Sequence, residues 1–167
     1  AIVSGSCSAA TRGQVEAFKK AGGRATALDP LALATDPSLT ARVLQWAGET
    51  LASGPVLVYS TAEPAAVRQV QERLGVQQAG GLVERALAEI ARGLVERGVR
   101  QLVVAGGETS GAVVQALRVE RLRIGPQIDP GVPWCAAHSP VARGTIHLAL
   151  KSGNFGTPDF FTKAFRH

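Results

Sequence analysis

The sequence predicts an α/β fold with a mostly parallel sheet, helices on both faces and three layers in all. Short apolar segments alternate with helical patterns for most of the 167 residues, as in βα units joined by right-handed crossovers. Residues 102–105 are apolar without alternation, which is typical of a strand covered on both faces. The length fits one domain over residues 1–167.

The first half of the chain predicts three strands, each followed by a helix. Thr11 and Gln14 match a capping box, and Gly22 and Gly23 end the helix that they begin. Pro64 stands near the start of the third helix. The expected elements are a strand at 1–5, a loop and helix at 6–23, a strand at 24–29, a helix at 36–54, a strand at 55–60 and a helix at 63–75.

The second half begins with the clearest helix, at 81–97, whose apolar residues share one face while charged residues occupy the other. The helix after the buried strand is expected to be capped by Thr109 or Ser110, and the last one by Thr157 with Pro158 at its first position. The remaining elements are a strand at 100–107, a helix at 109–117, a strand at 121–128, a turn-rich connector at 129–135, a strand at 144–152 and a helix near 157–165.

Composition narrows the function classes. The net charge is +5, but the basic residues are scattered and have no aromatic residues among them, so no nucleic-acid partner is expected. Cys7 and Cys135 lack metal-ligand spacing, which predicts two buried or half-buried thiols and no metal centre. No apolar run is long enough to cross a bilayer. We expect a cytoplasmic protein without a membrane partner, and the strand-like start without Met predicts a piece of a longer chain.

Three polar, glycine-bearing turns follow predicted strands. They are GSCS at 5–8, GGETSG at 106–111 and KSGNFG at 151–156. Parallel strands would bring these turns to one edge of the sheet, beyond the carboxyl ends of the strands, where α/β folds bind ligands.

The middle turn is the most informative. Gly106 and Gly107 let a ligand approach the backbone, and the following helix offers unpaired N–H groups and the positive end of its dipole. Together these features suit phosphate. Thr109 and Ser110 add hydroxyl donors, whereas Glu108 is left for Mg²⁺, a ribose hydroxyl or nearby N–H groups. No G-K-[ST] sequence closes the turn, so it is not a Walker A loop, and an ordinary helix start is the alternative.

The other two turns add further candidates. Ser6 and Ser8 are expected to donate hydrogen bonds to phosphate, or else to cap the first helix. Lys151 is expected to place a charge against a phosphate, or else to be a solvated lysine. Core positions are expected for the aromatic residues Phe155, Phe160 and Phe161, and Trp134 is expected to pack on the sheet. Asp129 is expected to be a turn residue, and His138 to lie in a connector.

Together these motifs resemble a known family. GSCS at 5–8 with Thr11 and Gln14, AGGETSG at 105–111, PGVPW at 130–134, LKSGNFG at 150–156 and DFF at 159–161 occur in the order seen in the carboxyl-terminal nucleotide-binding domain of the four-carbon acid sugar kinases. The resemblance implies phosphorylation of a four-carbon sugar acid, such as a 3-oxo-tetronate, threonate or erythronate, by ATP with Mg²⁺. It also implies that ATP contacts Ser6, Gly106, Gly107, Glu108, Thr109 and Gly153. Ser8, Ser110 and Lys151 are added as neighbours by the geometric argument above.

The chain departs from the family in one respect. Family members carry a preceding substrate-binding domain with an acidic DDxTG-type motif, which this sequence lacks. The resemblance therefore implies that the sugar acid and the catalytic base belong mainly to a missing amino-terminal domain, and that this chain holds ATP or ADP but is a poor kinase alone. A stand-alone nucleotide-binding or regulatory module without catalysis is the alternative function. Homodimer formation is left open.

Overall fold

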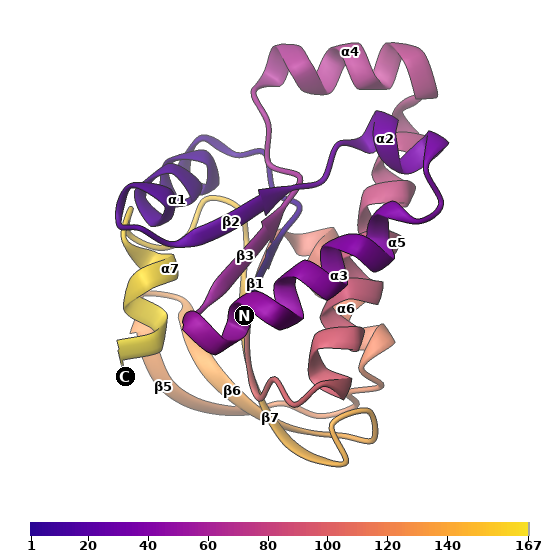
Figure 1. Cartoon of the computed structure of the whole chain (residues 1–167). Helices are drawn as coiled ribbons and strands as arrows, with labels where there is room; N and C mark the ends of the chain where they lie inside the picture. Colours follow the sequence, from indigo (N-terminus) through magenta and orange to yellow (C-terminus); the bar gives the residue numbers. More distant parts are fainter. Residues whose placement is uncertain (167) are drawn as a thin grey trace.

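The structure, a computed structural model, describes residues 1–166, which form a twisted sheet flanked by helices (Figure 1). Within these residues the sheet has seven strands in the order β2-β3-β1-β4-β7-β6-β5. The strands are β1 (Ile2–Ser4), β2 (Arg24–Ala27), β3 (Val56–Tyr59), β4 (Gln101–Ala105), β5 (Arg123–Asp129), β6 (Val132–Ser139) and β7 (Gly144–Lys151). The helices are α1 (Ala9–Lys20), α2 (Pro30–Thr35), α3 (Leu39–Thr50), α4 (Pro64–Leu74), α5 (Val76–Glu96), α6 (Gly107–Ala116) and α7 (Phe160–Lys163), with 3₁₀ turns η1 (Leu51–Ser53) and η2 (Ala164–Arg166).

The sheet is mixed, with a parallel part that holds β2, β3, β1, β4 and β7. Strand β6 pairs antiparallel with both β7 and β5. The connections explain this, because β5, β6 and β7 are joined by short turns, whereas parallel neighbours need a longer crossover. The predicted α/β class with a mostly parallel sheet is confirmed. The predicted connector at 129–135 is wrong: most of it belongs to β6, and His138 lies in that strand rather than in a connector.

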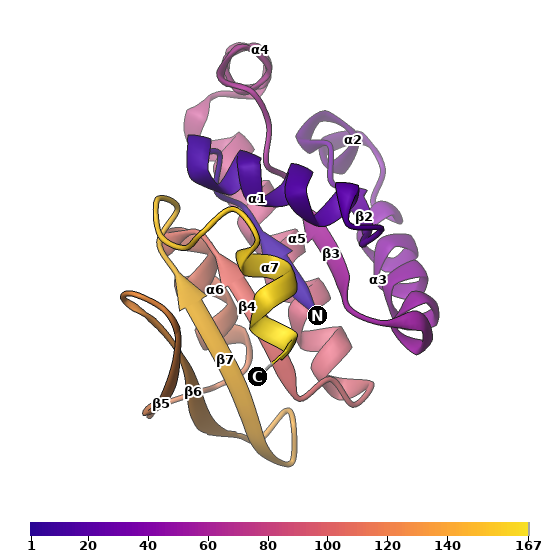
Figure 2. The same cartoon turned by 90° about the vertical axis from the view of Figure 1, so that its left-hand side faces the viewer.

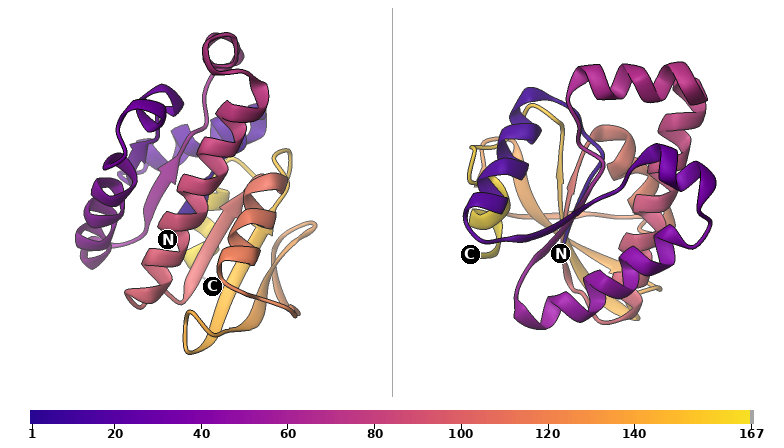
Figure 3. Two further views of the ribbon diagram at one scale, coloured as in Figure 1. Left: turned by 90° about the vertical axis from the view of Figure 1, so that its right-hand side faces the viewer. Right: turned by 45° about the horizontal axis from the view of Figure 1, so that its top comes forward.

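Two buried clusters lie on opposite faces of the sheet and make the fold three-layered, as predicted. Helices α1 and α7 cover one face, where Phe18, Phe160 and Phe161 pack on the strands (Figure 2). Helices α3, α5 and α6 cover the other face (Figure 3), and Leu87, Ile90 and Leu94 of α5 belong to the buried cluster there. Alternate strand side chains point to opposite faces, so Ile2 and Val3 of β1 enter different clusters.

Three predicted helix starts are wrong. Helix α1 is capped by Ser8, whose hydroxyl accepts a hydrogen bond from the Thr11 N–H, so Thr11 and Gln14 do not form the capping box. Helix α6 starts at Gly107 with Gly106 at the N-cap, not Thr109 or Ser110. Helix α7 has Asp159 at its N-cap instead of Thr157. Tertiary contacts, described below, occupy the side chains of Thr11, Gln14, Thr109 and Thr157, which were expected to cap.

Two further differences concern the region between β2 and β4. Helix α2 was not predicted; it is a short helix that Asp29 caps through the N–H of Leu31. Helix α5 begins at Val76, five residues before the predicted start at 81. Helix α4, between them, buries none of its side chains and lies along the outside of the molecule above α2 (Figure 1).

Candidate functional site

The three glycine-bearing turns lie side by side at one edge of the sheet, as predicted. Strands β1, β4 and β7 are neighbours, and their last residues Ser4, Ala105 and Lys151 are in register. The N–H of Gly5 donates to the Ala105 carbonyl at 3.0 Å, and the N–H of Gly106 donates to the Lys151 carbonyl at 2.9 Å. The chain therefore leaves all three strands at the same level, at their carboxyl ends.

The middle turn presents free N–H groups to this edge. Gly106 has φ +123°, a conformation that favours glycine, and no side chain caps α6. Within residues 1–166 the N–H groups of Gly107, Glu108 and Thr109 have no acceptor, since the first helical bond runs from Ser110 to Gly106. A Cβ atom on Gly107 would meet nothing within 4 Å. The helix dipole, the free donors and the open space together suit an anion.

The side chain of Thr109 lies behind this turn rather than on its surface. The residue is 1% exposed, and its hydroxyl donates to Glu84 Oε1 at 3.2 Å. A Cβ atom on Gly5 would come within 2.3 Å of Thr109 Oγ1, and one on Gly106 within 2.9 Å. Thr109 therefore fills the space between two glycines and fixes the spacing of the first and middle turns. Only its N–H group remains available to a ligand.

Glu84 is a site residue that sequence reasoning missed. It lies on α5, and its Oε2 atom is buried without a hydrogen-bond partner among residues 1–166. Burial raises the pKa of this carboxyl, and the charge of Glu108 adds to the rise, while the hydrogen bond from Thr109 opposes it. The helical pattern assigned Glu84 to the charged outer face of α5; that α6 packs against α5 was not visible in the pattern. Ser110 Oγ is likewise buried without a partner.

The first and third turns are joined through one carbonyl. Gly153 O accepts hydrogen bonds from Ser8 Oγ at 2.6 Å and Thr11 Oγ1 at 2.8 Å. A Cβ atom on Gly153 would lie 2.5 Å from Ser6 Oγ, so a glycine is needed for this close approach. The Ser8 hydroxyl is thus engaged in capping and in holding the third turn. Ser6 is half-buried, and its hydroxyl makes a longer contact of 3.3 Å with Ser8 Oγ.

Lys151 lies beneath the site, and the alternative that it is a solvated lysine is wrong. The residue is 1% exposed, and its ammonium donates to Thr11 Oγ1, Ser152 O and Gly153 O at 3.0–3.2 Å. All three N–H donors are therefore used. Burial lowers the pKa of Lys151 to about 8. None of these partners carries a negative charge, so among residues 1–166 the ammonium has no counter-ion in contact.

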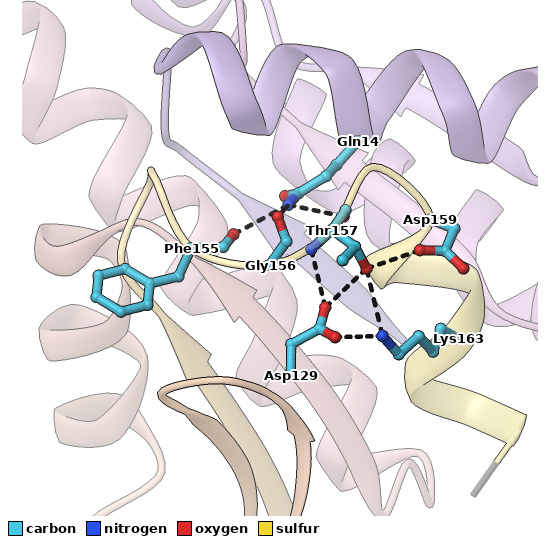
Figure 4. Close-up of polar contacts among 7 residues, drawn as sticks. All are labelled: Gln14, Asp129, Phe155, Gly156, Thr157, Asp159 and Lys163. Atoms are coloured by element: carbon cyan, nitrogen blue, oxygen red, sulfur yellow. Dashed lines mark hydrogen bonds and ion pairs between the residues drawn. The ribbon is translucent and has the colours of Figure 1, made fainter.

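Gln14 supports the third turn from α1 (Figure 4). Its Nε2 donates to the carbonyl oxygens of Phe155, Gly156 and Thr157 at 3.0–3.2 Å. Phe160 and Phe161 are buried, as predicted, but Phe155 is 46% exposed, and its core position was predicted wrongly. The carbonyl contacts of Gln14 hold the turn at the surface, so the Phe155 ring does not reach the core.

Asp129 supports the other end of the same turn (Figure 4). It ends β5, is 3% exposed, and accepts hydrogen bonds from the Thr157 N–H and hydroxyl, both at 2.8 Å. Lys163 pairs with its other oxygen. Burial disfavours the charged carboxylate, but the Lys163 and Thr157 contacts outweigh burial and lower the pKa of Asp129. The expected turn residue is therefore a buried anchor, and Trp134 is buried against the sheet, as predicted.

Further features complete the description of residues 1–166. Cys135 is buried and Cys7 half-buried, both as free thiols, as predicted. Residues 1–166 contain no group of three or more His, Cys, Asp or Glu side chains suited to a metal ion. In the same residues no helix has the length and hydropathy needed to cross a membrane. A hollow of about 640 Å³ lined by Arg92, Arg100, Arg118 and Arg143 lies at the opposite edge of the sheet, away from the three turns.

Comparisons with known proteins identify the family to which the chain is similar. Residues 1–161 match the family described as nucleotide-binding C-terminal domain. A 3-oxo-tetronate kinase of Pseudomonas fluorescens is 53% identical over 98% of this chain, and one of Cupriavidus necator is 52% identical over 99%. The chain spans 37% of the length of each. A crystal structure of a Haemophilus influenzae protein superposes with TM-score 0.92 at 39% identity, covering 99% of this chain and 39% of that one.

Proposed function

The chain belongs to the family of nucleotide-binding C-terminal domains, and from this membership we propose that it holds ATP and ADP for a kinase that acts on four-carbon sugar acids. The relatives named 3-oxo-tetronate kinase support this reaction class. The observation that carries the proposal is the start of α6, where three N–H groups have no acceptor within residues 1–166 and the space beside Gly107 is open.

In this proposal the backbone binds the phosphates. The N–H groups of Gly107, Glu108 and Thr109 donate to phosphate oxygens, because charge-assisted bonds at a helix start favour a bound anion. Gly106 shapes the turn through its positive φ. The half-buried Ser6 is the hydroxyl best placed to add a side-chain donor.

The remaining predicted site residues have supporting roles. Gly153 lets the third turn pack against Ser6, and Ser8 and Lys151 hold Gly153 through its carbonyl oxygen. Ser110 stays a predicted neighbour of the phosphates. The buried Lys151 charge favours an anion at this edge without contacting it.

A magnesium ion fits this arrangement only with help from the nucleotide. Mg²⁺ in nucleotide sites is held by one or two carboxylates together with phosphate oxygens and water. Glu108 is exposed in the first turn of α6 and is the carboxylate that would hold it. The ion would neutralise phosphate charge and so assist phosphoryl transfer.

The sugar acid is proposed to bind mainly through residues outside this chain, which spans 37% of its curated relatives. Catalysis of phosphoryl transfer rests on positioning and charge stabilisation, so the chain contributes the fixed nucleotide. The alternative function is nucleotide binding or regulation without catalysis. A homodimer and a cytoplasmic location stay predictions.

Isothermal titration of the chain with ATP and ADP, with and without Mg²⁺, tests the proposal. We expect saturable one-to-one binding, tighter for ATP when Mg²⁺ is present. No heat and no thermal stabilisation by either nucleotide would refute it. A complete protein containing this chain is expected to form ADP from ATP when 3-oxo-tetronate is added. The chain alone is not expected to do so. ATP and ADP binding without such ADP formation by the complete protein would favour the alternative.

A further inference from the structure

We infer that the adenosine part of the nucleotide lies in an apolar groove between α2, α4 and α5, where Glu84 accepts a hydrogen bond from a ribose hydroxyl. The inference rests on the proposed nucleotide function. It adds a second binding region to the phosphate turns.

The groove has a volume of about 600 Å³. Its apolar lining comes from Leu28 before α2, from Ala66, Val67 and Val70 of α4, and from Ala79 and Val83 of α5. Helix α4 forms the outer wall and buries none of its own side chains (Figure 1). Pockets of this size and lining are typical of sites for flat, mostly apolar ligands.

The groove opens onto the phosphate turns. Gly5 and Cys7 of the first turn and Glu108 of the middle turn belong to its lining. A ligand in the groove is therefore continuous with an anion bound at the start of α6. This is the arrangement that a nucleotide requires, with a base at one end and phosphates at the other.

One residue that lines the groove carries an unpartnered acceptor atom. Glu84 lines the groove, and its Oε1 is fixed by the Thr109 hydroxyl, while Oε2 is buried and has no partner within residues 1–166. A buried acceptor without a donor is unfavourable. A ribose hydroxyl would supply the missing donor, as acidic residues do in dinucleotide-binding folds.

The charges of the groove favour a nucleoside over an acid. Among residues 1–166 the charged residues in its lining are Asp29, Glu84 and Glu108, and no Lys, Arg or His of this range accompanies them. Such a lining repels the carboxylate of a sugar acid but accepts a neutral base and ribose. Gln71 supplies a primary amide, a group that pairs with the polar edge of adenine.

A pair of neighbouring substitutions on α4 tests the location. Ala66 lines the groove, Ala65 does not, and both are exposed, so neither change disturbs the core. In Ala66→Trp the indole fills the groove, and we expect ADP affinity to fall at least tenfold in calorimetric titration. Ala65→Trp should bind ADP like the unchanged protein. Equal ADP affinity in the two variants would overturn the inference.

Two more measurements complete the test. The 2′-deoxy and 3′-deoxy forms of ADP are titrated separately, and at least one should bind about fivefold more weakly than ADP. In Glu84→Ala this difference in affinity between ADP and the deoxy form should disappear. Deoxy forms that both bind as tightly as ADP would overturn the role of Glu84. If Ala66→Trp binds ADP normally while Gly107→Val does not, the proposed function stands and the groove assignment fails. If the unchanged protein does not bind ADP, the function itself fails.

Discussion

Replacing Gly107 with valine tests the phosphate turn directly. Gly107 is exposed at the first position of α6, and a Cβ atom there would meet nothing within 4 Å. Gly111, one turn further along the same helix, is also exposed and equally free of neighbours. Gly111→Val is therefore a matched control that places the same side chain on the same helix, away from the free N–H groups.

The two changes should separate folding from binding. Neither side chain meets a clash, so the free energy of unfolding should change by less than about 0.5 kcal/mol in both variants. A hydrogen bond to a charged group contributes roughly 1.5–3 kcal/mol. If the valine keeps phosphate away from two of the three N–H groups, binding weakens by at least about 3 kcal/mol, or about 100-fold.

Calorimetric titration with ADP and ATP gives the affinities, and thermal unfolding checks that both variants are folded. We expect Gly107→Val to lose nucleotide binding and Gly111→Val to retain it. Two folded variants with the same ADP affinity would refute the assignment of phosphate to the start of α6.

Other predictions concern the supports of the site. The pKa of Lys151 is about 8 when folded and 10.5 ordinarily, so in this window the unfolded chain holds more protons and a rise in pH stabilises the folded state. Lys151→Met should flatten the rise in urea stability between pH 8 and 10; parallel curves for both proteins would contradict this reasoning. Asp129→Asn removes the charge that pairs with the partly exposed Lys163 and should lower the free energy of unfolding by about 2 kcal/mol. Asp159→Asn, at an exposed position, should change the free energy of unfolding little. Equal losses of stability in the two variants would count against a special role of the Asp129–Lys163 pair. Gly153→Ala places a Cβ atom 2.5 Å from Ser6 Oγ and should weaken ADP binding about tenfold in titration. An unchanged ADP affinity would show that ADP binding does not depend on the position of the third turn.

The position of the three turns could be predicted from sequence. The carboxyl ends of parallel strands lie at the same edge of a sheet, so a glycine-bearing turn after each strand comes to that edge. The register of Ser4, Ala105 and Lys151 follows this rule. A strand pattern followed by glycines was enough to place each turn, because the position of a turn depends only on where the backbone of its strand ends.

The roles of individual side chains could not be predicted in the same way. Thr11 and Gln14 have capping-box spacing, yet they contact the third turn, about 140 residues away in sequence. Lys151 was expected to face a phosphate or, as the alternative, solvent, and lysine is seldom buried without a carboxylate. Both outcomes depend on α1 packing over the end of β7, which no local pattern contains.

Strand β6 was missed for a related reason. Its start is rich in turn-forming residues, with Pro130, Gly131 and Pro133 close together. Pro133 is accommodated because it faces Gln127 where the β5–β6 register shifts. Proline is tolerated at such bulges, which local composition does not distinguish from a loop.

The three turns at the sheet edge come from the beginning, the middle and the end of the chain. Residues 5–8 reach Gly153 only when β7 has taken its place, and the Ser8 and Thr11 contacts to its carbonyl join positions more than 140 residues apart. A growing chain therefore has no finished site until nearly all of it has left the ribosome. Contacts of such long sequence separation also form late in folding, since loop closure must precede them. Any ligand that needs all three turns stabilises the complete domain and no partly folded form of it.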